Sequence, residues 1–132
     1  MKIINIIQAT RQLEYVCFFN VKFKTQEGPA YAFFGVDCYS QFAFSTGVEL
    51  SDDPEIILKH IYLLTEDLNF KKHIHSGFTL VLPDHQELGD RINTMITPLH
   101  GKLRFDPTYH QQITKPLIES INDSMKKKLQ PL

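Results

Sequence analysis

The feature that most constrains the fold is a change in the spacing of apolar residues along the chain. From Glu14 to Lys24 the odd positions are apolar and the even positions turn polar near the end, which is the two-residue period of a strand with one exposed face. A Gly-Pro turn at 26–29 and two further apolar runs, at 30–36 and 41–50, follow directly. These segments predict three consecutive strands that form an antiparallel meander.

Beyond residue 51 the apolar spacing becomes helical and then alternates with short apolar runs. A helix is predicted from Pro54, a residue favoured in the first turn. Its core-facing side is expected to carry Ile57, Ile61, Leu64 and Leu68. Further strands are expected at 78–83 and 102–105, and further helices at about 85–96 and from 113–116 to about 129. The order predicts a single α/β domain over residues 1–132, with a mixed five-stranded sheet flanked by helices.

Composition and charge narrow the class of protein. The chain has 132 residues, 42% of them hydrophobic, which is enough for a core without disulfides. No apolar run reaches the length of a membrane span and no signal peptide is recognised, so we expect a cytoplasmic location and no membrane partner. The net charge of −1 means that any DNA contact must come from a local patch. Cys17 and Cys38 are predicted to be buried free thiols, and His73 and His75 surface histidines.

Two acidic residues stand where functional sites are commonly built. Asp84 directly follows the apolar run 78–83, and the carboxyl ends of strands in open α/β sheets are frequent binding sites. Glu119 lies on the last predicted helix, away from its apolar stripe and on one face with Lys115. Position alone also allows both to be solvated helix caps.

The motifs around these two residues follow one another in a recognisable order. They are Asp84, His100-Gly101, Asp106-Pro107, Tyr109-His110-Gln111-Gln112 and Ile118-Glu119-Ser120-Ile121-Asn122. An apolar strand ending in Asp, a His-Gly turn, a Pro- and Gln-rich loop and a helix that carries Glu together resemble the second half of the catalytic core of retroviral integrases and insertion-sequence transposases. The resemblance implies an RNase H-like fold.

The upstream half of the chain resembles the same family. The second strand ends in Asp37-Cys38-Tyr39-Ser40-Gln41, similar to the Asp-x-x-Ser pattern of the transposase branch, and the likeness extends over about residues 13–125. Counting back to the first strand places the family's first catalytic Asp on Asn20. The chain departs from the family pattern in two more places. His85-Gln86-Glu87 replaces a Gly-containing turn, and Pro116 stands where the last loop often has Gly.

The resemblance implies phosphoryl transfer assisted by two Mg²⁺ or Mn²⁺ ions about 4 Å apart. A carboxylate bridges such ions, whereas Asn20 offers one neutral oxygen. The sequence therefore predicts a degenerate integrase or transposase core in which Asn20, Asp84 and Glu119 mark the former catalytic and metal-binding positions. One alternative is an active polynucleotidyl transferase that binds Mg²⁺ through Asp37, Asp84 and Glu119. Another is a protein-interaction module that keeps the fold as a scaffold.

Partners follow from the same resemblance. The exposed face of the last helix in integrases carries basic residues that touch DNA phosphates. This makes Lys115 and Lys126, together with Lys22 and Lys24 on the first strand, candidates for weak, salt-sensitive DNA contacts. These lysines could equally be an ordinary solvated surface. A homodimer is the other expected assembly.

Overall fold

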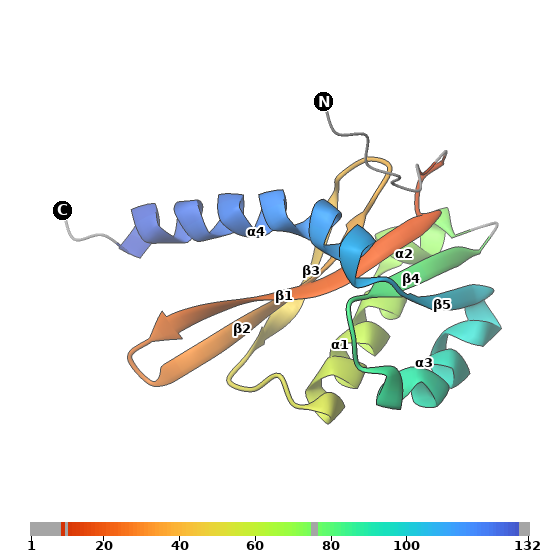
Figure 1. Ribbon diagram of the computed structural model, residues 1–132, viewed down its shortest axis with the longest axis horizontal. Helices are drawn as coiled ribbons and strands as arrows, with labels where there is room; N and C mark the ends of the chain where they lie inside the picture. The colour runs from red at the N-terminus through yellow and green to blue at the C-terminus, as the bar shows by residue number, and fades with distance from the viewer. Residues whose placement is uncertain (1–8, 10, 75–76, 130–132) are drawn as a thin grey trace.

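The computed structural model describes residues 9, 11–74 and 77–129, and one five-stranded sheet forms its centre (Figure 1). The strands are β1 (Tyr15–Thr25), β2 (Gly28–Asp37), β3 (Ala43–Glu49), β4 (Phe78–Leu82) and β5 (Gly101–Phe105). Their spatial order is β3-β2-β1-β4-β5. The first three strands pair antiparallel, whereas β4 is parallel to β1 and β5 is parallel to β4. The predicted meander and the predicted mixed sheet are both confirmed.

Helices cover both faces of this sheet (Figure 1). The helices are α1 (Pro54–Glu66), α2 (Leu68–His73), α3 (Gly89–Ile96) and α4 (Pro107–Leu129), and the short 3₁₀ helices η1 (Gln86–Leu88) and η2 (Thr97–Leu99) flank α3. The first three α-helices pack on one face and α4 lies on the other. Within the described part of the chain, no helix has both the length and the apolar character needed to cross a bilayer.

The two-residue period of β1 divides the core between these faces. Val16 and Phe18 belong to the larger hydrophobic cluster, beneath α1, α2 and α3. Cys17, Phe19 and Val21 belong to the smaller cluster, beneath α4. Successive side chains of a strand point to opposite faces, so one strand contributes to both cores. The even positions beyond Phe18 lie on the α1 side, where the described helices no longer cover them fully.

The prediction that Leu68 faces the core is wrong, because its side chain is 77% exposed. The helix that starts at Pro54 ends at Glu66, and α2 begins as a separate helix. The Asp67 carboxylate accepts hydrogen bonds from the backbone N–H groups of Asn69 and Phe70, at 2.9 and 3.1 Å. This is an N-cap, which satisfies donors that a new helix start leaves unpaired. Phe70, fully buried, fills the core position instead.

The last helix starts earlier than predicted. The segment expected to be a Pro- and Gln-rich loop forms the first two turns of α4, which begins at Pro107. The Asp106 Oδ1 atom accepts a hydrogen bond of 3.0 Å from the backbone N–H of Tyr109, and Pro107 stands at the first helical position, where no N–H is required. Pro116 lies inside the helix, so one backbone hydrogen bond is absent there.

Candidate functional site

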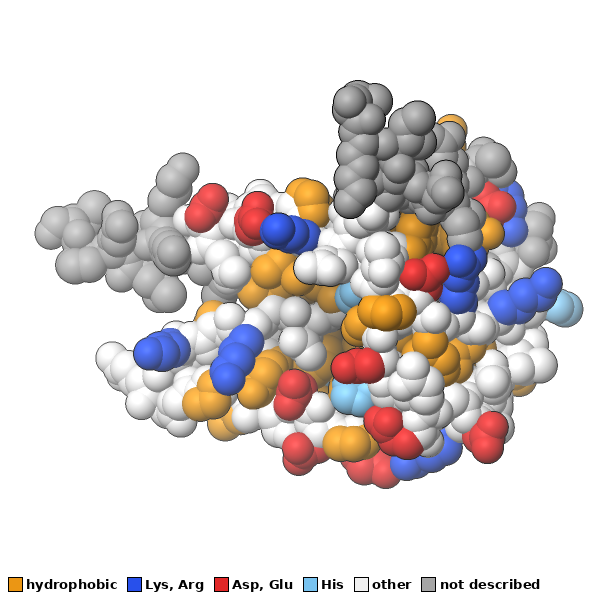
Figure 2. All heavy atoms as spheres, in the orientation of Figure 1, with side chains coloured by type: hydrophobic (Ala, Val, Ile, Leu, Met, Phe, Trp, Pro, Cys, Tyr) orange, Lys and Arg blue, Asp and Glu red, His pale blue; other side chains and the backbone are white. Residues whose placement is uncertain are grey.

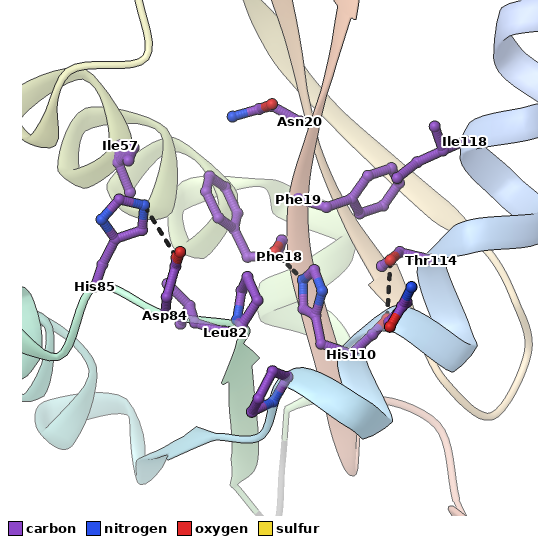
Figure 3. A pocket seen from close by; sticks show the side chains of 13 residues that line it. Phe18, Phe19, Asn20, Ile57, Leu82, Asp84, His85, His110, Thr114 and Ile118 are labelled. Carbon is purple, nitrogen blue, oxygen red and sulfur yellow. Dashed lines mark hydrogen bonds and ion pairs between the residues drawn. The ribbon is translucent and has the colours of Figure 1, made fainter.

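Strand pairing brings Asn20 and Asp84 to the same place. β1 and β4 run parallel, with Cys17 opposite Val81. Continuing this register by three residues puts Asn20 beside Asp84, which follows β4 directly. Both residues line one cavity of about 440 Å³ at the carboxyl end of β4 (Figure 3). The structure therefore unites two of the residues that the sequence singled out, through pairing of strands more than 60 positions apart.

The cavity wall is largely apolar and contains few charged groups. Its lining residues are Phe18, Phe19, Asn20, Ile57, Leu82, Pro83, Asp84, His85, Pro107, His110, Gln111, Thr114 and Ile118. Of these described residues, Asp84 alone is a carboxylate. Mg²⁺ and Mn²⁺ prefer several oxygen ligands, with carboxylates foremost. The donor set offers one carboxylate, that of Asp84, and the amide oxygens of Asn20 and Gln111, which does not fit the pair of divalent ions that the resemblance implies.

His110 connects α4 to the sheet at the floor of this cavity. Its Nε2–H donates a hydrogen bond to the backbone carbonyl of Phe18, at the point where β4 has ended beside β1. Burial lowers the pKa of His110, while the hydrogen bond to Phe18 and the nearby Asp84 carboxylate act in the opposite direction. The ring is therefore neutral at pH 7, with its proton on Nε2. Thr114 supports the same turn by donating to the His110 carbonyl at 2.8 Å.

Asp84 pairs with a neighbouring histidine at the rim of the cavity. Its Oδ1 lies 3.1 Å from Nε2 of His85, whose Nδ1 lies 3.1 Å from Glu87 (Figure 3). The predicted helix over 85–96 is wrong at its start, because His85 has a left-handed backbone with φ of 73° and the chain continues as a 3₁₀ turn. Asp84 is 67% exposed in its side chain, so these surface pairs contribute little to stability.

Asp37 does not reach this cavity. β2 is antiparallel to β1 and places Asp37 opposite Val16, four positions before Asn20. The carboxylate is 2% exposed, and its oxygens accept hydrogen bonds from the Leu13 N–H at 2.9 Å, the Tyr39 N–H at 3.2 Å and the Ser40 hydroxyl at 2.7 Å. These contacts tie the start of β1 to the turn after β2. Asp37 therefore acts as a buried structural cap in this structure, which does not bring it together with Asp84, and its role as an alternative metal ligand stays a prediction.

Glu119 lies on the outer face of α4. Its side chain is exposed, and it is absent from the cavity wall, where Ile118 stands. Consecutive helical residues differ by about 100° in direction, so Glu119 points away when Ile118 points in. Among the described residues, no three His, Cys, Asp or Glu side chains form a group that could hold a metal ion. The structure does not bring the predicted Glu119 together with Asn20 and Asp84, and its role as a ligand stays a prediction.

The predicted DNA-contacting lysines do not form one cluster in the described part of the chain. Lys22 and Lys24 are exposed on β1, and Lys22 Nζ lies 5.9 Å from the centre of the Tyr31 ring. Lys115 is exposed on α4. The side chain of Lys126, near the end of α4, is outside the described residues, as are those of His73 and His75.

Cys17 and Cys38 lie side by side, which their sequence positions do not indicate. Their Sγ atoms are 3.5 Å apart across the β1–β2 pair; Cys17 is buried as predicted, and Cys38 is partly exposed. The hydrogen bond from Cys17 lowers the pKa of Cys38, with a smaller contribution from the Tyr109 hydroxyl. The same contact, together with burial, raises the pKa of Cys17.

Sequence reasoning missed His110 and Ile118 as parts of the site. The Asp-Pro pair at 106–107 carries the signal of a helix N-terminus, which would have placed the following residues on a helix. With that start, Gln111, Thr114 and Ile118 fall on one face at spacings of three and four residues. Which face meets the sheet depends on the packing of α4, and no local signal reports it.

The mixed five-stranded sheet with helices on both faces is an α/β fold of the RNase H-like kind. No protein-family model and no curated protein matches the sequence. A solved structure does match: that of a simian T-cell lymphotropic virus intasome in complex with the PP2A regulatory subunit B56 gamma. The similarity has a TM-score of 0.66 at 10% identity and covers 97% of this chain. It covers 47% of the matched chain, so this chain spans about half of that length. At this identity the likeness shows the fold alone.

Proposed function

We propose that this domain is a degenerate integrase or transposase core that has lost metal-dependent strand transfer and functions as a non-catalytic binding module. The observation that carries the proposal is the wall of the cavity beside Asp84. Its described lining holds the Asp84 carboxylate together with Asn20 and Ile118, whereas an enzyme of this chemistry needs further carboxylates. One carboxylate does not neutralise a pair of divalent ions. Without both ions, the attacking and leaving oxygens of phosphoryl transfer are not stabilised in the transition state.

The alternative of an active enzyme has less support. It needs Asp37, Asp84 and Glu119 around the same ions. Asp37 is buried among backbone donors and Glu119 faces outward on α4. A conformational change that united all three would have to break the Asp37 cap and rotate the helix.

The proposal also includes weak binding to DNA that does not depend on the DNA sequence. Lys22, Lys24 and Lys115 are exposed and available to phosphates. Neutralising a few phosphates gives affinity that falls steeply with salt. We expect any binding to duplex DNA to disappear at roughly 0.2 M salt, and a charge-removing Lys22→Ala, Lys24→Ala double variant to weaken it further.

The test rebuilds the missing ligands. Calorimetry with Mn²⁺ compares the wild type with the double variant Asn20→Asp, Ile118→Glu, which puts three carboxylates into one cavity. We expect no saturable heat from the wild type at up to about 1 mM ion, and binding by the double variant. Glu119→Gln, a change at the next position of the same helix, is the matched control and is expected to alter neither result.

A plasmid-nicking assay with Mn²⁺ accompanies the titration, and the wild type is expected to leave supercoiled DNA intact. The proposal is overturned if the wild type binds Mn²⁺ at micromolar concentration or nicks DNA, and if Glu119→Gln abolishes that behaviour. In that case Glu119 is a ligand after all and the domain is an enzyme.

A further inference from the structure

The outer half of β1 has an open edge. β4 pairs with β1 only as far as Cys17, while β1 continues to Thr25. The carbonyl of Glu14 faces β4, because it accepts from the Thr79 N–H, and the Phe18 carbonyl faces the same way towards His110. Backbone groups alternate in direction along a strand, so those of Asn20, Lys22 and Lys24 also point away from β2. Within the described residues, the structure gives these groups no hydrogen-bond partner.

A hollow runs beside this edge, between α4 and the β1–β2 hairpin (Figure 2). It continues the cavity at Asp84, and hydrophobic side chains gather on its walls. On the α4 side the wall is apolar, with Phe19 and Ile118. On the other side of the sheet, the exposed side chains of Lys22 and Lys24 follow one another at two-residue spacing.

We propose that this edge binds an extended peptide with alternating apolar and acidic residues, which adds to the sheet beside β1 from Asn20 to Lys24. The inference rests on the proposed loss of strand transfer, since in an active enzyme the hollow would have to admit nucleic acid. The main chain of such a peptide supplies the N–H and C=O partners that the edge lacks. Its apolar side chains enter the hollow beneath α4, and its acidic side chains lie beside the two lysines.

His110 sets where the peptide begins. Its ring already occupies the Phe18 carbonyl, so pairing starts at Asn20, the next residue whose backbone faces the edge. From Asn20 to Thr25 the strand offers room for about six residues at roughly 3.3 Å each. A short linear motif in a partner protein meets these requirements without a large interface.

Charge and hydrogen-bonding chemistry disfavour a second copy of this chain, or a nucleic acid, at this edge. A second copy paired two-fold on this edge sets lysines of both chains against one another, and like charges directly opposite destabilise a sheet. The phosphate oxygens of a nucleic-acid backbone accept but do not donate hydrogen bonds, so that backbone leaves the three carbonyls of the edge unpaired.

The probe is a fluorescein-labelled peptide Val-Glu-Val-Glu-Val-Glu, and its binding is followed by anisotropy at low salt. Two peptides of the same sequence, one N-methylated on its valines and one on its glutamates, keep every side chain and each lose half of the backbone donors. The one that loses the N–H groups facing β1 is expected to bind at least tenfold more weakly. The protein variant Lys22→Glu, Lys24→Glu is expected to lose about tenfold in affinity and to gain affinity for the Val-Lys counterpart. Lys102→Glu, a matched charge change on β5, is expected to leave binding unchanged.

Amide hydrogen exchange locates the bound peptide. We expect slower exchange at Asn20, Lys22 and Lys24 when the peptide is bound, and no change along the β3 edge. The inference is overturned if N-methylation has no effect, if protection appears elsewhere, or if single-stranded DNA binds the same edge more tightly than the peptide. Sedimentation of a dimer that the Lys22→Glu, Lys24→Glu variant dissociates would instead assign the edge to a second copy. DNA nicking by the wild type would refute the proposed function, whereas failure of peptide binding alone refutes only this inference.

Discussion

Replacing His110 with Ala tests the contact that anchors α4 to the open end of the sheet. The side chain is 6% exposed, and its Nε2–H donates to the Phe18 carbonyl. Losing that bond removes about 1 kcal/mol net, and a buried carbonyl left without a donor costs about 1–3 kcal/mol. Water in the adjoining cavity of about 440 Å³ can reach this carbonyl and keeps the loss near the middle of that range. We expect the free energy of unfolding to fall by about 2–3 kcal/mol.

Urea unfolding followed by circular dichroism measures this change. For a domain of this size each kcal/mol corresponds to about 4 °C, so the melting temperature should fall by roughly 8–12 °C. Gln111→Ala, at the next and exposed position of α4, is the control and should change stability by less than about 0.5 kcal/mol. His110→Gln retains an N–H donor and should recover part of the loss. The reasoning is refuted if His110→Ala and Gln111→Ala are equally stable.

Acid, thiol chemistry and the Asp37 cap supply three further tests. Because the pKa of His110 is lowered in the folded state, the unfolded chain binds the proton more readily, so stability should decline as pH falls below about 6.5; His110→Gln should flatten this part of the pH profile in urea unfolding. Iodoacetamide at pH 7.5 should label Cys38 before Cys17, since the pKa of Cys38 is lowered and that of Cys17 raised; equal labelling rates in a peptide map would contradict this. Asp37→Ala leaves the buried N–H of Leu13 unpaired and should cost about 2–4 kcal/mol in the same unfolding assay, with no effect on Mn²⁺ titrations. A variant as stable as the wild type would show that the cap is dispensable.

Most of the fold could be predicted from local patterns in the sequence. Local sequence indicates the alternation in β1, the Gly-Pro turn and the short apolar run before Asp84. For the strands this is because their side chains repeat every two residues. Element ends were less well predicted. The helix from Pro54 stops before Leu68 because Asp67 caps a new helix, and a capping side chain competes with a periodic pattern that continues past it.

The site was only partly predictable. Asn20 and Asp84 each stand at a recognisable place on their strands, and parallel pairing brings them to one cavity. Whether Ile118 or Glu119 faces the cavity depends on how α4 is rotated about its axis, because consecutive helical residues point in directions about 100° apart. Packing of its apolar face on β1 sets that rotation, and this packing is a long-range contact.

The sequence by itself determined the strands, the helices and their order, because hydrophobic period and turn chemistry act between neighbours along the chain. Tertiary structure alone decided which side chains meet. It paired Cys17 with Cys38, turned Asp37 into a buried cap, and placed His110 where β4 ends beside β1. It also left the edge of β1 open beyond that point. Each of these outcomes follows from pairing and packing between segments far apart in sequence, where local patterns carry no information.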